Sequence, residues 1–180
     1  QLKRAETAHE YSLFILSDTR DEAIAEQELH AFASLRDRLG PQARIYYRRR
    51  ADNTDRKVGN LADWVERWGG GYGAMLVLDA DSLMSGKAIV DLSDAMARDP
   101  SAGLIQSFPK LFGAETLFGR VQQFSNTIYG AALAEGLASW ADREGNYWGH
   151  NAIIRTAAFA SCAGLPKLNT VRSKGALILS

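Results

Sequence analysis

Two aspartates separated by one residue follow an apolar run near the middle of the chain. The run LVLDADS, residues 76–82, places Asp79 and Asp81 directly after Leu78. If a strand continues through Asp81, residues two apart face the same side of it, and both carboxylates project toward one point. Two converging anions repel each other unless a cation or hydrogen-bond donors compensate them. The spacing therefore suits a divalent cation, since Mg²⁺ is often held by one or two carboxylates together with substrate phosphates.

A second interpretation of these two residues requires no ligand. Asp81 would cap a helix that begins near Ser85, and Asp79 would be a solvated residue at a strand end. A D-x-D pattern is short and arises often by chance. Spacing alone leaves the two interpretations open.

Other charged residues follow the first two apolar runs of the chain. Asp18 comes directly after the first run, where an acid is commonly a helix N-cap. A run of basic residues follows the second. Such a run is commonly a solvated loop, although beside acids and a phosphate it can supply counter-charge. The basic residues are Arg48, Arg49, Arg50, Arg56 and Lys57.

The composition disfavours several other kinds of site. The 21 Lys and Arg residues balance 21 Asp and Glu, so the chain lacks the net positive charge typical of nonspecific nucleic-acid binding. The single Cys162 cannot form an internal disulfide, and the three histidines lack zinc-binding spacing. The glycine run at 69–73 precedes a strand and lacks the GK[ST] of a phosphate loop, so it is interpreted as a helix end and turn. The best candidate for a membrane span, residues 127–140, is too short and contains Glu135.

Short apolar runs alternate with stretches of helical periodicity along the chain. The predicted order, strand first, is 11–17, 21–40, 43–48, 60–71, 74–81, 86–100, 102–109 and 115–140, with breaks of the last helix at Gly130 or Gly136 left open. This alternation predicts a single α/β domain over residues 1–180, with a mostly parallel sheet and helices on both faces. In such sheets ligands bind beyond the carboxyl ends of the strands, so Asp18 and Asp79 are expected on one edge.

The motifs, taken together and in order, resemble a known family. KVGN at 57–60, the DAD of 79–81, QSFP at 106–109 and GHNA at 149–152 resemble the motifs of family 2 processive glycosyltransferases, the group that contains cellulose synthase. More narrowly, FILSDT, YYRRR, GNLADW, LDADSLMSG, LFGRVQQFSNTIYG and NYWGHNAIIR resemble the glucans biosynthesis glucosyltransferase H family of Gram-negative bacteria. The resemblance runs in unbroken order from Tyr11 to Pro166.

The resemblance implies a Rossmann-like GT-A fold, the fold of nucleotide-diphospho-sugar transferases, here truncated at both ends. It implies that Asp18 contacts the uridine and that Lys57 and Asn60 line the nucleotide pocket. Asp79 would lie by the ribose or diphosphate, and Asp81, together with Asp79, would ligate Mg²⁺ or Mn²⁺.

The resemblance also implies a site for the sugars. Gln106 and Pro109 match a turn near the sugar channel, although QSFP is one residue longer than in some relatives. The loop between donor sugar and acceptor matches Trp148, Gly149, His150 and Asn151. At His150 many relatives have Thr or Ser. A purely structural alternative for Tyr147 and Trp148 is core packing.

As a function, the resemblance implies metal-dependent, inverting transfer of glucose from UDP-glucose to a growing β-glucan, in the synthesis of osmoregulated periplasmic glucans. The parent protein would lie in the bacterial inner membrane, with this domain on the cytoplasmic face beside transmembrane helices of the same chain. The family's catalytic base is expected beyond Ser180, so no catalytic residue is assigned and residues 1–180 alone are not expected to turn over sugar. Two alternatives remain open: another family 2 transferase, such as a cellulose or hyaluronan synthase relative, and a noncatalytic nucleotide-binding regulatory domain.

Overall fold

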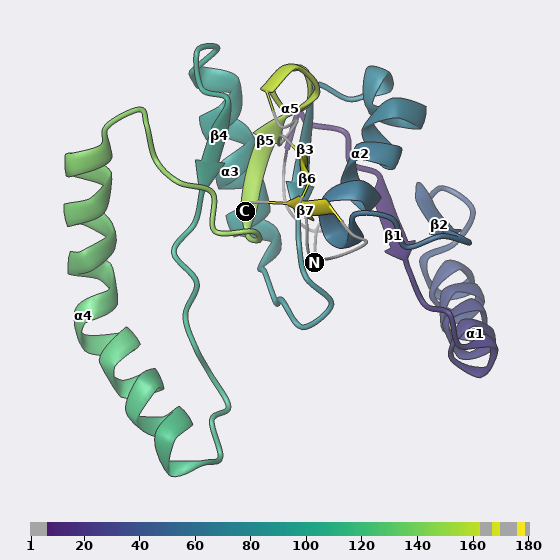
Figure 1. Ribbon diagram of the computed structural model, residues 1–180, viewed down its shortest axis with the longest axis horizontal. Coiled ribbons are helices and arrows are strands. Elements are labelled where there is room, and N and C mark those ends of the chain that lie inside the picture. The colour runs from purple at the N-terminus through teal and green to yellow at the C-terminus, as the bar shows by residue number, and fades with distance from the viewer. Residues whose placement is uncertain (1–6, 163–166, 170–175, 179–180) are drawn as a thin grey trace. The chain divides into compact units, whose positions relative to one another are not determined.

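The computed structural model describes residues 7–162, 167–169 and 176–178 (Figure 1). The described chain is α/β, as predicted, and forms two compact units. The N-terminal unit contains residues 7–72 and the residues from 160 onward, and the central unit contains residues 73–159. In the described part of the chain, no helix has the length and apolar character that crossing a membrane requires. The GLP segment at 164–166, where the family resemblance ends, lies outside the described residues.

The N-terminal unit begins with two parallel strands and the helix that joins them. Leu13 pairs with Ile45 at the start of the register. The carboxylate of Asp21 caps the intervening helix by accepting hydrogen bonds from the amides of Ala23 and Ile24, and Gly40, with φ of 79°, ends it. The elements are β1 (Leu13–Ser17), α1 (Glu22–Leu39), β2 (Ile45–Arg49), α2 (Arg56–Trp68) and the 3-10 turn η2 (Gly69–Gly71). The glycine run thus ends a helix, as predicted. Two further strands, β6 (Lys167–Asn169) and β7 (Ala176–Ile178), pair antiparallel.

Aromatic rings hold the N-terminal unit together. Phe14 of β1 stacks on Tyr46 of β2, with ring centroids 4.8 Å apart, and meets the edge of Trp64 of α2 at 5.3 Å. Tyr72 packs against both Phe14 and Trp64. Aromatic side chains bury large apolar areas, so this cluster ties α2 to both strands.

The central unit contains a three-stranded sheet of order β3-β5-β4. Its elements are β3 (Ala74–Val77), α3 (Gly86–Arg98), β4 (Leu104–Gln106), α4 (Leu117–Ala141), β5 (Ala152–Arg155) and the start of α5 (Thr156–Cys162). Its core is formed by Leu92 and Met96 of α3 and Ile153 of β5, packed against apolar residues of β3, β4 and the loop before α3.

The prediction of a mostly parallel sheet is wrong for this unit. β3 and β4 run in the same direction, but β5 lies between them and pairs antiparallel with both. The alternation of strands and helices predicts the direction of consecutive strands. It does not predict a third strand between them, and the four-residue β5 was not predicted at all.

Helix α4 runs unbroken over 25 residues, through both glycines at which a break was left open. At Gly130 the ring of Phe108 occupies the place of a side chain, because a Cβ built there would lie 2.5 Å from two ring atoms. A Cβ on Gly136 would meet nothing within 4 Å. The glycine at position 130 is thus needed for the close contact with Phe108, whereas no neighbour requires a glycine at position 136.

The start of α2 contains a closer contact at Gly59, inside the KVGN motif. A Cβ at this position would lie 2.1 Å from the carbonyl oxygen of Thr54. The preceding loop turns back on the helix through Asp55 and Arg56, with φ of 56° and 48°. Residues other than glycine rarely adopt this left-handed backbone conformation, so the loop is strained as well as closely packed.

We predict that Gly59→Ala destabilises the protein while Gly136→Ala stabilises it. The new methyl group at position 59 must displace backbone, and overpacking of this kind costs about 1–3 kcal/mol. At position 136 the methyl group meets open space, and replacing a helical glycine by alanine gains roughly 0.5–1 kcal/mol. Urea denaturation of the two variants measures both changes. Equal effects of the two substitutions would contradict the contact at Gly59.

Candidate functional site

Three of the predicted motifs meet at one edge of the central sheet. β3 ends at Val77, two residues before Asp79, and β4 ends at Gln106. The strand between them, β5, begins at Ala152, directly after the WGHN loop, and its first residue pairs with both Val77 and Gln106. Because β5 is antiparallel to its neighbours, its amino end lies beside their carboxyl ends. The DAD, QSFP and WGHN segments therefore leave the sheet at the same edge.

Backbone hydrogen bonds of Asn151 fix the end of the WGHN loop. Its amide donates to the carbonyl of Val77 at 2.8 Å, and its carbonyl accepts from both the amide and the hydroxyl of Ser107 at 3.0 Å. Asn151 has φ of 53° and Gly149 has φ of 97°. Asparagine and glycine are the residues that most readily adopt positive φ, which explains their presence at these two turns.

Gln106 holds the middle of the same loop with both ends of its amide group. Its Oε1 accepts from the amide of Trp148 at 2.8 Å, and its Nε2 donates to the carbonyl of Asn146 at 3.4 Å. Phe108 meets Trp148 edge to face, at 6.2 Å between ring centroids. Trp148 is 42% exposed, so core packing does not account for it. The predicted sugar-site residues Gln106, Trp148, Gly149, His150 and Asn151 thus lie in one cluster.

Pro109 and Arg155 flank this cluster and have structural contacts. The carbonyl of Pro109 accepts from Asn126 of α4. The guanidinium of Arg155, which ends the GHNAIIR motif, donates to the carbonyls of Met96 and Asp99 at the end of α3 and to that of Ala102. Cationic donors satisfy the last carbonyls of a helix, so Arg155 anchors α3 to β5.

The two aspartates lie in a turn and not in a strand. β3 ends at Val77, and the amide of Ser82 donates to the carbonyl of Asp79 at 3.0 Å. The prediction that the strand continues through Asp81 is therefore wrong, and the two-residue alternation does not orient the carboxylates. Helix capping by Asp81 is also wrong, because Ser85 caps α3 through the amide of Ala88.

The charge of Asp79 affects the phenol of Tyr147, the residue directly before the WGHN segment. Burial and, secondarily, the negative charge of Asp79 raise the pKa of Tyr147 to about 12. Both effects disfavour the phenolate, since one removes its hydration and the other repels it. The DAD turn is therefore close enough to the WGHN segment for a charge on one to be felt by the other.

The carboxylates of the DAD turn suit a cation that is shared with a ligand. Within the described ranges, no group of three or more His, Cys, Asp or Glu side chains converges as a metal site. Two carboxylates alone are too few for an all-protein cage, but they fit Mg²⁺ completed by phosphate and water oxygens. Asp81 is exposed and Asp79 is partly exposed, so ligand oxygens can reach them.

Two polar atoms of the WGHN loop are buried without hydrogen bonds. Nδ1 of His150 and Oδ1 of Asn151 have no hydrogen-bond partner in the described part of the chain. A buried polar atom without a partner costs roughly 1–3 kcal/mol. Such a cost marks a loop that gains from a polar ligand or ordered water.

In the N-terminal unit, Asp18 forms a bidentate ion pair with Arg50. Its two carboxylate oxygens accept from Nε and Nη2 at 2.7 Å each, and the side chains are only 18% and 11% exposed. The same guanidinium donates to the carbonyls of Thr54 and Arg56. The hydrogen bonds to Asp18 raise the pKa of Arg50. Asp18 is thus not a helix cap, since Asp21 caps α1, and its pairing with Arg50 was not predicted.

Asn60 and Lys57 of the KVGN motif have different environments. Asn60 is buried, and its Nδ2 donates to the carbonyl of Leu16 at 3.4 Å, while its Oδ1 is one of the buried polar atoms without a hydrogen-bond partner in the described part of the chain. Lys57 is exposed on the first turn of α2. No described contact assigns either residue to a nucleotide, so those roles stay predictions.

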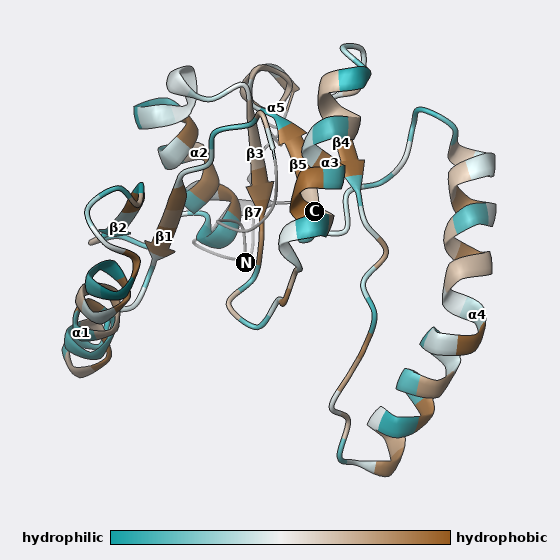
Figure 2. Cartoon of the chain, turned by 180° about the vertical axis from the view of Figure 1, so that it is seen from behind, coloured by the Kyte–Doolittle hydropathy of each residue, from teal (hydrophilic) through white to brown (hydrophobic). Residues whose placement is uncertain are grey.

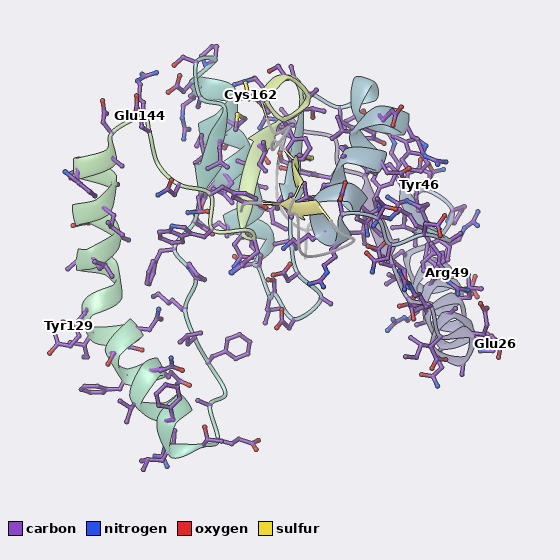
Figure 3. The ribbon with its side chains drawn as sticks, in the orientation of Figure 1. Glu26, Tyr46, Arg49, Tyr129, Glu144 and Cys162 are labelled. Carbon is purple, nitrogen blue, oxygen red and sulfur yellow. The ribbon has the colours of Figure 1, made fainter. Side chains whose placement is uncertain are left out.

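Arginines of the basic run form ion pairs with acidic residues of the N-terminal unit. Arg48 pairs with Asp63 at 3.1 Å, and burial lowers the pKa of Arg48. Arg49, labelled in Figure 3, pairs with Glu22 of α1. A cleft of about 410 Å³ opens beside these residues, lined by Arg48, Arg49, Arg50, Ala51, Asp52, Thr54, Asp63 and Arg67. The solvated-loop interpretation is therefore wrong for Arg48 and Arg50.

Comparison with known proteins connects the chain to one set of relatives. It is 53% identical over 170 residues to glucans biosynthesis glucosyltransferase H of Xylella fastidiosa, a match that covers 94% of the chain and 27% of the relative. It is 51% identical over 179 residues to the protein of the same name from Vibrio cholerae, covering 99% of the chain and 25% of the relative. The match to the Xanthomonas campestris protein is 52% identical over 170 residues.

These matches confirm the resemblance seen in the sequence. The chain is homologous, over nearly its whole length, to one segment of these proteins, and it spans about a quarter of their length. No protein-family model matches the chain, and no solved structure matches it.

We predict that Asp79→Asn lowers the pKa of Tyr147. The substitution removes the repelling charge but leaves the burial, so the pKa falls and stays above the ordinary value of about 10. Ultraviolet absorbance of the phenolate, with Tyr147→Phe to assign the signal, follows the titration. Asp81→Asn is the control and leaves the pKa unchanged. An unchanged pKa in Asp79→Asn would show that the turn and the WGHN segment are farther apart than described.

A second prediction concerns the ion pair of the N-terminal unit. Arg50→Lys keeps the positive charge but cannot form two parallel hydrogen bonds to Asp18 or reach both loop carbonyls. We expect it to lower the free energy of unfolding by about 1–3 kcal/mol. Arg67→Lys, which alters the ion pair between the exposed Arg67 and Asp63 on α2, changes the free energy of unfolding by less than about 0.5 kcal/mol. Denaturant unfolding of both variants tests this difference, and equal losses would contradict it.

Proposed function

We propose, from the homology of this chain to a quarter-length segment of glucans biosynthesis glucosyltransferase H, that it is part of a glucosyltransferase acting in glucan biosynthesis. More specifically, we propose that it takes glucose from UDP-glucose and serves an inverting, metal-dependent transfer to a growing β-glucan. The GT-A fold belongs to the same proposal, because the α/β architecture agrees with it without being specific for it.

The observation that carries the proposal is the convergence of three motifs at one sheet edge. The DAD turn, Gln106 and the WGHN loop come from segments far apart in the sequence and meet where β5 pairs with β3 and β4. A structural role alone would not require two carboxylates, an exposed tryptophan and buried polar atoms that lack a partner among the described residues, all at the same place. A nucleotide sugar would use each of them.

Asp79 and Asp81 are the residues that would hold the divalent metal. The bound metal would supply positive charge for the departing diphosphate. The neighbouring residues of this chain have separate tasks. Gln106 orients the WGHN loop through Trp148, and the exposed ring of Trp148 offers an apolar face to a sugar. Polar atoms of His150 and Asn151 would pair with sugar hydroxyls once the loop adjusts to a ligand.

For the N-terminal unit, we propose that Asp18, Lys57 and Asn60 serve the uridine end of the donor. Both carboxylate oxygens of Asp18 already bind Arg50, so its contribution would be to hold Arg50 and the loop at 54–56 in place. The buried Oδ1 of Asn60 is an acceptor that lacks a partner in the described part of the chain.

The cellular setting is also proposed. The parent protein would lie in the inner membrane of a Gram-negative bacterium, with this segment on the cytoplasmic face and transmembrane helices elsewhere in the same chain. Its partners would be UDP-glucose and the glucan acceptor, and no nucleic acid. The family base would lie outside the described residues, and none of them is assigned as catalytic.

The first experiment is calorimetric titration of UDP into the protein, with Mg²⁺, with Mn²⁺ and with neither. We expect binding that depends on the metal, because the diphosphate and both carboxylates are negative. Asp81→Ala should weaken it by at least about tenfold, equivalent to about 1.4 kcal/mol.

The matched control is Asp91→Ala, which removes an exposed acid of α3 paired with Lys87 and should leave the affinity unchanged. Equal binding with and without metal would refute the metal site. Metal-dependent binding by the full-length protein without glucose transfer would favour the noncatalytic alternative.

A further inference from the structure

Helix α4 exposes an apolar stripe that its own unit does not cover. Leu117, Val121, Phe124 and Ile128 are all more than half exposed. Within the central unit, no strand or other helix packs extensively against α4 in the described residues. Figure 2 shows apolar residues recurring along the helix. A set of large side chains left in water on one element commonly marks an interaction surface.

The spacing of the stripe is that of a helix-packing seam. Its residues are separated by four, three and four positions, and Ala131 extends it by three more. Apolar residues that alternate at three and four positions lie on one narrow line of a helix and pack against a second helix. A second row of exposed apolar residues, Tyr129, Leu133, Leu137 and Trp140, lies on another face of the C-terminal half of α4. Gln122 and Ser125 separate Phe118 from that row, so Phe118 belongs to neither row.

The opposite side of α4 is already occupied. Asn126 bonds to both Leu111 and Pro109, Gln123 accepts from the amide of Ala114, and Phe108 covers Gly130. The helix is thus held in one orientation by the preceding loop. At 3.6 residues per turn the stripe lies on the side of the helix opposite Gln123, Asn126 and Gly130. Tyr129, which is labelled on α4 in Figure 3, points away from the preceding loop on a third face.

We infer that the stripe docks an apolar helix from the part of the full-length protein outside this segment. The matched relatives extend over about four times the length of this chain, so most of such a protein lies outside it. Helix α4 contains only two charged residues, Arg120 and Glu135, unlike the Lys- and Arg-rich helices that lie on lipid surfaces. A hollow of about 300 Å³ lies at the edge of the stripe, between Phe124 and the loop contact of Gln123 with Ala114, and is lined also by Arg120 and Thr127.

This inference rests on the homology to a longer protein and not on sugar transfer. Hydroxyl-radical footprinting with peptide mass spectrometry tests it without substitutions. The 180-residue chain and the full-length protein are compared. Modification of Val121, Phe124 and Ile128 should fall on the order of fivefold in the full-length protein, since a packed side chain loses most of its contact with water.

Phe118 is the internal control, because it is 73% exposed against 63% for Phe124 and lies off the stripe. Its modification should stay unchanged, whereas a detergent or lipid layer would protect both residues. Absence of protection in the full-length protein would overturn the inference. Protection of the 180-residue chain that grows with its concentration would assign the stripe to a second copy. Protection only on phosphatidylglycerol vesicles would assign it to a membrane surface.

Discussion

The candidate site depends on the pairing of Ala152 with both Val77 and Gln106. Without β5 between them, β3 and β4 would carry the DAD and QSFP segments at separate strand ends, and the WGHN loop would have no fixed place. The antiparallel direction of β5 brings the three segments together, because its amino end lies beside the carboxyl ends of β3 and β4. Ala152 is completely buried, so a larger side chain at this position would have to displace the core.

In the N-terminal unit, an ion pair and not a strand fixes the segments that follow β1 and β2. The guanidinium of Arg50, the residue directly after β2, binds the carboxylate of Asp18, directly after β1, and the loop carbonyls of Thr54 and Arg56. A bidentate pair of arginine and carboxylate fixes direction as well as distance. This explains how a loop with two residues at positive φ remains folded against Gly59 at the start of α2. Within the KVGN motif, Gly59 and Asn60 therefore have packing roles, Gly59 against Thr54 and the buried Asn60 against Leu16.

Local signals in the sequence predicted four of the described helices, because helix ends depend on neighbouring residues, but they did not predict the short α5 and placed the start of α2 at residue 60 and not at Arg56. Asp21 and Gly40 mark α1, Gly40 by its backbone freedom and Asp21 by its capping carboxylate. The motifs also identified the residues that gather at the sheet edge. The sequence did not predict β5, since a strand of four residues is defined by the strands it pairs with. The Asp18 and Arg50 pair lies 32 positions apart, and no local rule chooses Arg50 over its neighbours.

Phe108 connects the uncovered helix to the candidate site. Its ring fills the space above Gly130 of α4 and meets the edge of Trp148 in the WGHN loop. The loop that carries it is joined to α4 by Asn126 and Gln123 and to β4 by the chain itself. A partner that fixes the position of α4 therefore also fixes the position of Phe108, and the ring of Phe108 restricts the position of Trp148. The position of Trp148, the side chain that we propose faces a sugar, is thus connected through the ring of Phe108 to the helix that carries the apolar stripe.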